Sequence, residues 1–417
     1  MIGVEDSVFR EEDHTGLRWG VLVGDVLDRL ADIPDESVHC VVTSPPYWGL
    51  RDYGVEGQIG HEPTPAEFVE TMVRVFREVR RALRSDGTCW VNLGDSYAGV
   101  GKSGGGERGE MWRQEGRTVS GKRGGNWAPP PPGLKKGDLV GIPWSVAFAL
   151  RDDGWYLRQD GIWNKTNPMP ESSPTKSRLC KAHEYIFQFS KRSPGNYYFD
   201  RDAISEPATG QSPGNTTHRG ADAYAAGDEH HRTKVGLADV EATERRYKRS
   251  VWTMSTEPYA GPHFAAFPSK LPLTCIQAAT AQVGCCPHCG AGWERIVEKQ
   301  RAPTRPGTNT NVHGRDSIEV GNRDPQRHVT RTVTVGWRPT CDCEHTRDDL
   351  EPAVVFDPFL GTGTTVRAAI DLGRVGFGIE LNPDYAVEAV KRITKRADTK
   401  KVPGVADGQK DLFEEAV

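Results

Sequence analysis

The sequence predicts an α/β fold, a doubly wound and mostly parallel sheet with helices on both of its faces. Apolar runs of strand length alternate with amphipathic helical segments along most of the 417 residues. Two predicted strands end in rigid, turn-forming residues, at TSPPY (43–47) and at DPFLGTG (357–363). Strands that alternate with helices need crossover connections, and these connections build a parallel sheet that is covered on both faces.

Each predicted element follows from a local pattern. LRWGVLVGD (17–25) is typical of a strand that runs into a Gly-Asp turn, and residues 65–87 have apolar side chains at helical spacing before Asp-Gly ends the helix. The other predicted elements are a short helix at 26–34, strands at 37–47 and 87–97, a helix at 142–154, strands at 155–165 and 183–192, a strand-turn-helix unit at 353–365, a strand at 374–380 and a helix at 384–397.

Three stretches interrupt the alternation of strands and helices. Residues 99–136 are Gly-rich and basic, residues 202–250 are polar, and residues 284–350 hold clustered cysteines and a polar tract. Runs of this composition predict insertions or loops on the sheet. The tail after residue 400 is predicted to fray.

Composition excludes some classes of protein. The net charge is −4 and the pI is about 6.3, so nucleic-acid binding would need a local basic face. No apolar run is long enough to span a bilayer, and the N-terminal residues are too charged for a signal peptide. The nine cysteines are unevenly placed, which favours a metal site over a disulfide framework. The sequence therefore predicts a cytoplasmic chain.

VFDPFLGTGTT (355–365) has the pattern of a nucleoside-binding turn. It places Gly361 and Gly363 between an apolar strand and a helix, where glycine lets a ligand approach the backbone and the helix start offers free N–H groups. Glu380 ends the next predicted strand, 19 positions after Gly361, a spacing typical of the acidic partner of a ribose diol. A GxG alone is mostly a plain turn, but the strand, helix and Glu380 together predict a cofactor site.

TSPPY (43–47) follows a buried strand. Prolines fix φ and donate no backbone hydrogen bond, so Pro45 and Pro46 end the strand and hold a rigid loop. A rigid loop with Ser44 and Tyr47 at the carboxyl end of a strand is a common place for chemistry in α/β proteins. The alternative is a plain turn with packed aromatic residues, and for Trp48 and Tyr53 simple packing is an equal alternative.

The clustered cysteines form two close pairs. CPHC (286–289) and CDC (341–343) are separated by 51 residues and offer the thiolates of Cys286, Cys289, Cys341 and Cys343. A tetrahedral structural zinc site needs such pairs, with Cys285, His288 and His345 as substitute ligands. The alternative is a set of reduced surface thiols. The other cysteines, at 40, 89, 180 and 275, are predicted to be core residues.

The two turn motifs, taken together, resemble those of the S-adenosylmethionine-dependent DNA amino-methyltransferases. TSPPY comes first and DPFLGTGTT last, which is similar to the circularly permuted beta group of that family. HFAAFPSKLP (263–272) resembles the family segment that packs by the methionine part of the cofactor, and GDVLDRL (24–30) resembles its Gly-Asp segment. The resemblance implies a seven-stranded sheet with one reversed strand.

The resemblance also implies an organisation of the chain. The implied segments are a catalytic half at 1–97, a Gly/Arg-rich insertion at 98–137, core strands and a helix at 138–201, a target-recognition region at 202–250, a cofactor-site segment at 251–283, a small zinc-ribbon-like insertion at 284–350, a cofactor-binding half at 351–400 and a tail at 401–417. Arg and Lys of the two basic insertions, 99–136 and 202–250, would contact DNA, although solvated loops are an equal alternative for any one residue.

The resemblance implies roles for the residues of this sequence that match the family's motifs. The implied catalytic residues are Ser44, Pro45, Pro46 and Tyr47; the implied cofactor-binding residues are Asp25, Thr43, His263, Phe267, Pro268, Asp357, Pro358, Phe359, Gly361, Gly363, Thr364, Glu380 and Asn382. Ser44 and the Pro45 carbonyl would polarise an exocyclic amine, and Tyr47 would stack on a flipped base. The chemistry is direct attack on the methyl group, without a cysteine nucleophile.

The resemblance favours cytosine N4 in double-stranded DNA, because Ser-Pro-Pro-Tyr mostly accompanies that target, with adenine N6 as the alternative. An RNA or protein amine is a weaker alternative, because those relatives mostly carry Asn-Pro-Pro-Tyr in unpermuted order. The remaining alternative is a DNA-binding protein with an inactive cofactor site. This alternative is disfavoured by the presence of Asp357, Gly361, Gly363 and Glu380. The family also suggests a cognate restriction endonuclease as a partner.

Overall fold

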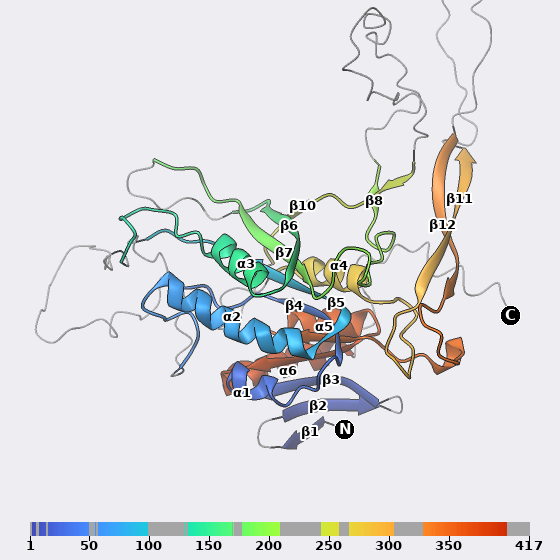
Figure 1. Cartoon of the computed structure of the whole chain (residues 1–417), viewed down its shortest axis with the longest axis horizontal. Coiled ribbons are helices and arrows are strands. Elements are labelled where there is room, and N and C mark those ends of the chain that lie inside the picture. The colour runs from blue at the N-terminus through green and yellow to red at the C-terminus, as the bar shows by residue number, and fades with distance from the viewer. Residues whose placement is uncertain are drawn as a thin grey trace, which may run out of the picture. The chain divides into compact units, whose positions relative to one another are not determined.

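The structure is a computed structural model that describes residues 2–5, 8–13, 16–49, 55, 57–98, 130, 132–168, 170, 177–208, 243–257, 267–303 and 328–397. These residues form two compact units. The first unit lies within Met1–Phe199, Arg249–Gly292 and Cys343–Val417, and the second within Asp200–Lys248 and Trp293–Asp342. Figure 1 shows the course of the chain through both.

A ten-stranded sheet forms the centre of the first unit. Its strands follow the spatial order β1-β2-β3-β14-β13-β4-β5-β7-β6-β10. Their bounds in that order are Ile2–Glu5, Val8–Asp13, Gly16–Val23, Val375–Glu380, Val354–Asp357, Val38–Thr43, Leu83–Leu93, His183–Ser190, Tyr156–Lys165 and Val251–Met254.

The strands at the centre of this sheet are parallel. From β3 through β14, β13 and β4 to β5 every neighbouring pair is parallel, whereas β7 runs antiparallel to both β5 and β6. The α/β fold with a mostly parallel sheet is therefore confirmed. The sheet is larger than the seven strands that the sequence predicted, because β1 and β2 form an antiparallel edge and β10 pairs with β6.

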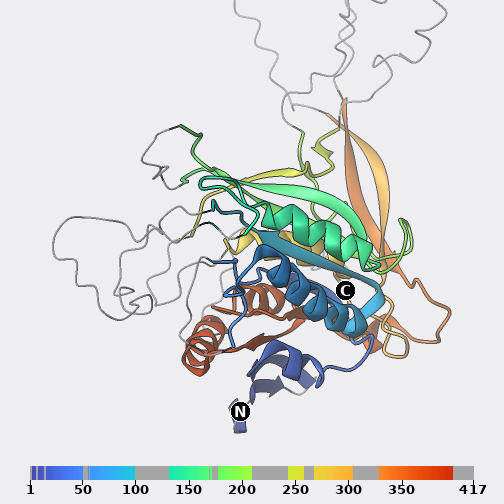
Figure 2. The same cartoon turned by 60° about the vertical axis from the view of Figure 1, so that its left-hand side comes forward.

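Helices cover both faces of the sheet. On one face lie α1 (Val26–Leu30), α2 (Pro65–Ala82) and α3 (Ile142–Asp152), which share one hydrophobic core; α2 and α3 lie side by side in Figures 1 and 2. The other helices are α4 (Lys270–Ala279), α5 (Thr364–Asp371) and α6 (Pro383–Ala397), and α5 packs against both α4 and α6. A parallel sheet buried on both faces is the doubly wound arrangement.

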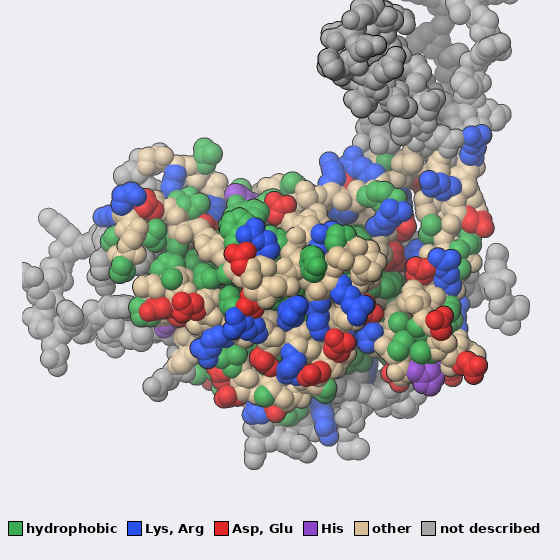
Figure 3. Space-filling view, viewed as in Figure 1, with side chains coloured by type: hydrophobic (Ala, Val, Ile, Leu, Met, Phe, Trp, Pro, Cys, Tyr) green, Lys and Arg blue, Asp and Glu red, His purple; other side chains and the backbone are tan. Residues whose placement is uncertain are grey.

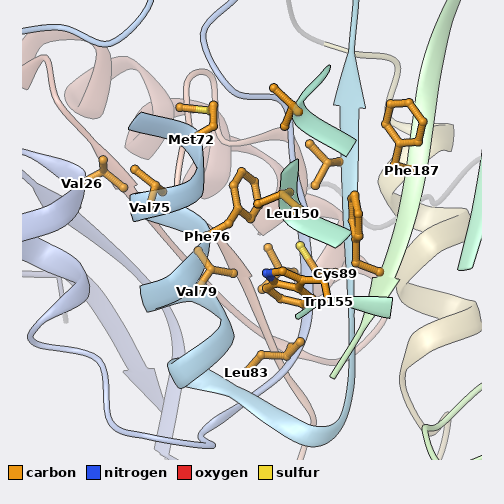
Figure 4. Close-up of a cluster of buried hydrophobic side chains, with 14 of the residues drawn as sticks. Val26, Met72, Val75, Phe76, Val79, Leu83, Cys89, Leu150, Trp155 and Phe187 are labelled. Carbon is orange, nitrogen blue, oxygen red and sulfur yellow. The ribbon is translucent and has the colours of Figure 1, made fainter. Parts of the chain in front are cut away.

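The helix α2 shows how local sequence sets an element. Thr64 and Glu67 form a capping box and Pro65 occupies the first turn, which satisfies the free N–H groups at the helix start. Apolar residues at helical spacing then face the core, where Figure 4 shows Val75 beside Val26, Phe76 beside Leu150 and Val79 beside Trp155.

The end of α2 differs from the sequence prediction, which placed it at Asp-Gly 86–87. The helix ends at Ala82, and β5 begins at Leu83, which pairs with Val38 and is fully buried. Arg84 and Ser85 thus lie within the bounds of a strand, in the irregular stretch between Leu83 and Thr88, the residues of β5 that pair with β4 on either side of it. Strands β1, β2 and β10 were also missed by the sequence analysis.

The second unit contains a long antiparallel hairpin of β11 (Glu294–Pro303) and β12 (His328–Arg338), and a short pair of β8 (Glu206–Pro207) and β9 (Arg245–Arg246). Arg295 forms an ion pair with Asp200 at 3.0 Å, and both side chains are buried. Most of the two basic stretches proposed for DNA contact, 99–129 and 209–242, lies outside the described residues.

The surface of the described residues is mixed in charge. Figure 3 shows basic and acidic side chains interspersed on one face of the molecule, as the small net charge leads one to expect. Among the described helices, none has the length and apolar character needed to cross a bilayer.

Candidate active site

The two turn motifs meet at one edge of the sheet. Strand β13 pairs in parallel with β4, with Val355 opposite Cys40 and Phe356 opposite Val41. Both strands therefore end at the same edge, so the loop after Thr43 and the loop after Asp357 lie next to each other. That edge is the usual place for a ligand in an α/β sheet.

A pocket lies between these two loops, with about 990 Å³ of empty space, part of it open to solvent. Its lining residues are Gly24, Asp25, Val26, Ser44, Pro45, Pro46, Tyr47, Gln58, Ile59, Phe267, Asp357, Pro358, Phe359, Leu360, Gly361, Thr362, Thr364, Ile379, Glu380 and Leu381.

The glycine turn is held from both sides. Gly361 has φ 53° and Gly363 has φ 73°, a left-handed conformation that favours glycine. The Gly361 N–H donates to Glu380 Oε2 at 2.9 Å, and Arg392 of α6 donates to the Thr362 carbonyl at 2.6 Å. The turn is therefore fixed by β14 and α6 before any ligand binds.

The carboxylate of Glu380 is the acidic end of the pocket. Its second oxygen, Oε1, accepts the Asn382 N–H at 3.0 Å. Burial raises the pKa of Glu380 to about 7, although its backbone donors oppose the shift. The carboxyl group therefore changes its charge near neutral pH.

Asp357 ties the turn to the core. Its carboxylate accepts a hydrogen bond from Thr365 Oγ1 at 2.7 Å and one from the Phe359 N–H at 3.1 Å. Thr365 Oγ1 also lies 3.1 Å from the Val42 carbonyl of β4. Burial raises the pKa of Asp357 to about 6. One hydroxyl thus joins the strands that carry the two turn motifs.

The Ser-Pro-Pro-Tyr loop carries a short chain of hydrogen bonds. Ser44 Oγ lies 3.5 Å from the Tyr47 hydroxyl, which donates to Glu184 Oε2 at 2.7 Å. Glu184 Oε1 accepts from Lys165 Nζ at 2.5 Å. Trp48 packs against the core and donates to the Glu62 carbonyl at 2.9 Å, which supports the packing interpretation of Trp48. Tyr53 lies outside the described residues.

Most predicted site residues come together in this pocket. The predicted catalytic residues Ser44, Pro45, Pro46 and Tyr47 line it, as do the predicted cofactor residues Asp25, Phe267, Asp357, Pro358, Phe359, Gly361, Thr364 and Glu380. Thr43, Pro268, Gly363 and Asn382 do not line it, and His263 lies outside the described residues. Asn382 instead uses its side chain to accept the Asp384 N–H at 2.9 Å, at the start of α6.

Several residues of the site were missed by sequence reasoning. Gln58 and Ile59 line the pocket from the segment after the TSPPY loop, and no local pattern marks them. Glu184 and Lys165 meet Tyr47 only because β6 and β7 pair in the sheet. Thr365 is part of the quoted glycine motif, and its position in the first turn of the helix was the available signal.

The four clustered cysteines converge as predicted by their spacing. The sulfur atoms of Cys286, Cys289, Cys341 and Cys343 all lie within 4.8 Å of one another. Cys286 is buried, Cys289 is exposed, and the other two are half-buried. Cys285 instead pairs through its backbone with Glu351. Of the cysteines predicted to be core residues, Cys40, Cys89 and Cys275 are buried, but Cys180 is exposed, so that prediction was wrong.

Comparisons with known proteins find relatives that are named as methyltransferases. Residues 38–292 and 350–391 match the family model of the N6/N4 DNA methylases. The chain is 34% identical over 376 residues to the Type II methyltransferase M.SmaI of Serratia marcescens, covering 90% of this chain and 91% of that protein. It is 40% identical over 370 residues to the Type II methyltransferase M.Cfr9I of Citrobacter freundii, covering 89% and 86% respectively. The solved structure of the PvuII DNA methyltransferase, described as cytosine-N4-specific, matches with a TM-score of 0.48 and 16% identity, covering 95% of this chain and 91% of that one.

Fold and pocket define an α/β protein whose ligand site lies at the carboxyl ends of parallel strands, between a glycine turn and an acidic strand end. The chain belongs to the DNA methylase family of S-adenosylmethionine-dependent N6/N4 amino-methyltransferases. The resemblance to DNA amino-methyltransferases that its motifs indicated is thereby confirmed.

Proposed function

We propose that the chain methylates the exocyclic N4 amine of cytosine in double-stranded DNA. The observation that carries the proposal is a single pocket lined by both Ser44–Tyr47 and the glycine turn with Glu380. A methyl donor in one part of this pocket and a base in the other would share one space. Such an arrangement favours direct transfer, because both reactants are held in place.

The residues present fit S-adenosylmethionine. Glu380 offers an ionisable carboxylate for the ribose hydroxyls, and Asp25 adds a second carboxylate to the same pocket. Val26, Phe359 and Ile379 supply apolar walls for a purine ring. We propose that these residues, with Phe267 and the glycine turn, hold the cofactor. When bound, the cofactor supplies an electrophilic methyl group on a sulfonium.

The Ser-Pro-Pro-Tyr loop would prepare the amine. The lone pair of an exocyclic amine is delocalised into the base, so the nitrogen is a poor nucleophile until it is held and polarised. Ser44 Oγ and the Pro45 carbonyl would accept its two hydrogens and draw the nitrogen towards tetrahedral geometry. Tyr47 would stack on the base after it leaves the duplex.

The choice of base rests on Ser44. Proteins with Ser-Pro-Pro-Tyr mostly act on cytosine N4, so adenine N6 is the alternative with the same fold and mechanism. An RNA or protein amine is a weaker alternative. A DNA-binding protein without catalysis is disfavoured, because Asp357, Gly361 and Glu380 are present and line one pocket.

We also propose that the core is a circularly permuted seven-stranded methyltransferase sheet. The support is the order β3-β14-β13-β4-β5-β7-β6, in which the last two strands of the chain lie between its third and fourth. In this proposal the glycine-turn half follows the catalytic half along the chain. β1, β2 and β10 would be additions.

A structural zinc ion is proposed for the four cysteines. Their sulfur atoms lie within 4.8 Å of one another, and four thiolates are a typical ligand set for structural zinc. Gly290, which follows Cys289, has φ 69° and contacts the Arg84 guanidinium, whose positive charge suits a zinc–thiolate centre of negative charge. The Gly290 carbonyl also accepts from His39 of β4 at 3.0 Å.

We also propose a partner protein and a role for individual segments of the chain. The relatives are named type II methyltransferases, which supports a cognate restriction endonuclease as a partner. The basic stretches at 99–136 and 202–250 would hold the DNA. The segment at 251–283 would complete the cofactor site through Phe267.

Nucleoside mass spectrometry tests the proposed function. Purified protein is incubated with unmethylated DNA and S-adenosylmethionine, and the digested DNA is searched for a new base. We expect N4-methylcytosine. N6-methyladenine would replace the cytosine assignment with the adenine one, and no new base in DNAs of varied sequence would contradict the proposal.

A further inference from the structure

Glu184 lies beside the catalytic loop but far from it in sequence. It is the second residue of β7, its side chain is 12% exposed, and it accepts one hydrogen bond on each oxygen. Tyr47 donates to Oε2 at 2.7 Å and Lys165, the last residue of β6, donates to Oε1 at 2.5 Å. With both oxygens bound, the carboxylate has one fixed orientation.

The ring of Tyr47 is confined as well. A methyl group added at Gly94, just after β5, would lie 2.7 Å from Tyr47 Cε2 and 3.3 Å from the Glu184 carboxylate. The ring edge therefore rests against the backbone of Gly94, and its hydroxyl is held by Glu184. No other residue type fits at position 94 without moving the tyrosine.

The carboxylate also sets the direction of the hydrogen bonds. An ionised carboxylate only accepts, so the Tyr47 hydroxyl must donate its proton to Glu184. The Tyr47 oxygen is then an acceptor for the hydroxyl proton of Ser44, which lies 3.5 Å away, at the outer limit of a hydrogen bond. Catalytic hydrogen bonds of this length tighten when substrate binds.

We propose that Glu184 is a positioning residue that, through Tyr47, turns the proton of Ser44 away from the target amine and leaves the lone pairs of Ser44 free to accept the amine hydrogens. This inference rests on the proposed function. Lys165 keeps Glu184 in place, because its ammonium group and the carboxylate are in direct contact.

A glutamine at position 184 has the same shape but can donate. Its amide could donate to the Tyr47 oxygen, and the Tyr47 hydroxyl would then donate its proton towards Ser44. The direction of the hydrogen bonds from Ser44 through Tyr47 to position 184 would be reversed. For Glu184→Gln we expect kcat to fall about 10-fold to 100-fold, a typical loss for a disturbed catalytic orientation. The S-adenosylmethionine Kd, the DNA KM and the unfolding midpoint should stay within about twofold or a few degrees of wild type.

A double-mutant cycle with Tyr47→Phe separates positioning from folding. Phenylalanine keeps the ring but removes the hydroxyl through which Glu184 acts, so Glu184→Gln should cause no further loss of kcat in that background. Glu388→Gln is the matched control, because Glu388 also pairs with a lysine, Lys391 at 2.7 Å, but on the outer side of α6. It should leave kcat unchanged in both backgrounds.

The outcomes are distinct. An equal loss from Glu184→Gln with and without the Tyr47 hydroxyl would show a general structural role and overturn the inference, as would wild-type kcat in Glu184→Gln. A wild-type protein that methylates no DNA base would overturn the proposed function, and the inference with it. Methylation of DNA by wild type, with no effect of Glu184→Gln, would overturn the inference alone.

Discussion

The backbone N–H of Gly361 donates to Glu380 Oε2 at 2.9 Å, across 19 positions of sequence. The bond joins the turn after β13 to the end of β14, two strands that are neighbours in the sheet. It aims the carboxylate into the pocket and holds the turn in its left-handed conformation. The acidic group and the glycine turn are thus one preorganised unit.

Glu380→Gln should weaken cofactor binding. The amide can accept one backbone N–H but must present its NH₂ group to the other, and it lacks the charge that binds hydroxyl groups strongly. We expect the S-adenosylmethionine Kd to rise about 10-fold to 100-fold, which calorimetry measures. Wild-type affinity should also increase as pH rises through about 7, where Glu380 ionises, whereas the variant should show no such trend. Equal Kd values in both proteins would contradict this role.

Buried Glu380 and Asp357 should make stability fall with rising pH. Their pKa values are raised to about 7 and about 6 from 4.5 and 3.8, so the native state binds more protons than the unfolded state between about pH 4 and 7. The free energy of unfolding contributed by these groups therefore decreases across that window and is constant above it. For Glu380 the change is on the order of 3 kcal/mol. Urea unfolding at pH 5, 6 and 7 should show a shallower pH slope for Glu380→Gln; an identical slope would refute the assignment.

Ser44→Ala and Tyr47→Ala should each lose turnover while cofactor affinity survives. In the proposed function both residues hold the base rather than the cofactor, so their loss would remove positioning of the amine or stacking of the ring. We expect kcat to fall about 100-fold, measured by transfer of labelled methyl groups to DNA. Tyr156→Ala, which removes an exposed tyrosine at the start of β6, is the control. Full activity in Ser44→Ala and Tyr47→Ala would exclude the catalytic role of the loop.

Sequence patterns predicted the parts of the site that local backbone chemistry determines. Prolines 45 and 46 end a strand, and glycines 361 and 363 adopt positive φ. Each motif therefore marks a turn that can be recognised from the sequence alone. Parallel pairing then brings the two turns to one edge, as the alternation of strands and helices indicated. The spacing of Glu380 predicted its place for the same reason, because one helix and one strand separate it from the turn.

The parts that depend on pairing between distant strands could not be predicted. Glu184 reaches Tyr47 because β7 pairs with β5 in an antiparallel register, and nothing near residue 184 signals it. Leu83 begins a strand because β4 offers a partner, although the local residues favour a helix. Asn382 was predicted for the cofactor site, and the structure shows its side chain accepting the Asp384 N–H at the start of α6, a contact that the motif did not indicate.

Purified protein should carry about one zinc ion per chain, because four thiolates whose sulfur atoms lie within 4.8 Å of one another are a typical ligand set for zinc. Elemental analysis measures the metal content. Cys289→Ser and Cys341→Ser should lower it and reduce the thermal midpoint by several degrees, as loss of a structural metal removes binding free energy from the folded state. Cys180→Ser changes an exposed cysteine outside the cluster and should do neither. Metal-free wild-type protein with an unchanged midpoint would rule the site out.

Thr365→Val should destabilise the fold without changing its shape. The side chain is fully buried, and its hydroxyl supplies the 2.7 Å hydrogen bond to Asp357 and lies 3.1 Å from the Val42 carbonyl. Valine fills the same volume but leaves a buried carboxylate without this donor, so we expect a loss of about 1–3 kcal/mol in the free energy of unfolding, measured in urea. Thr365→Ser keeps the hydroxyl and removes one methyl group, so it should cost less, about 1 kcal/mol. If serine cost as much as valine, packing rather than the hydrogen bond would be what Thr365 contributes. If only valine is costly, one hydroxyl holds together the strands that end in the two turn motifs.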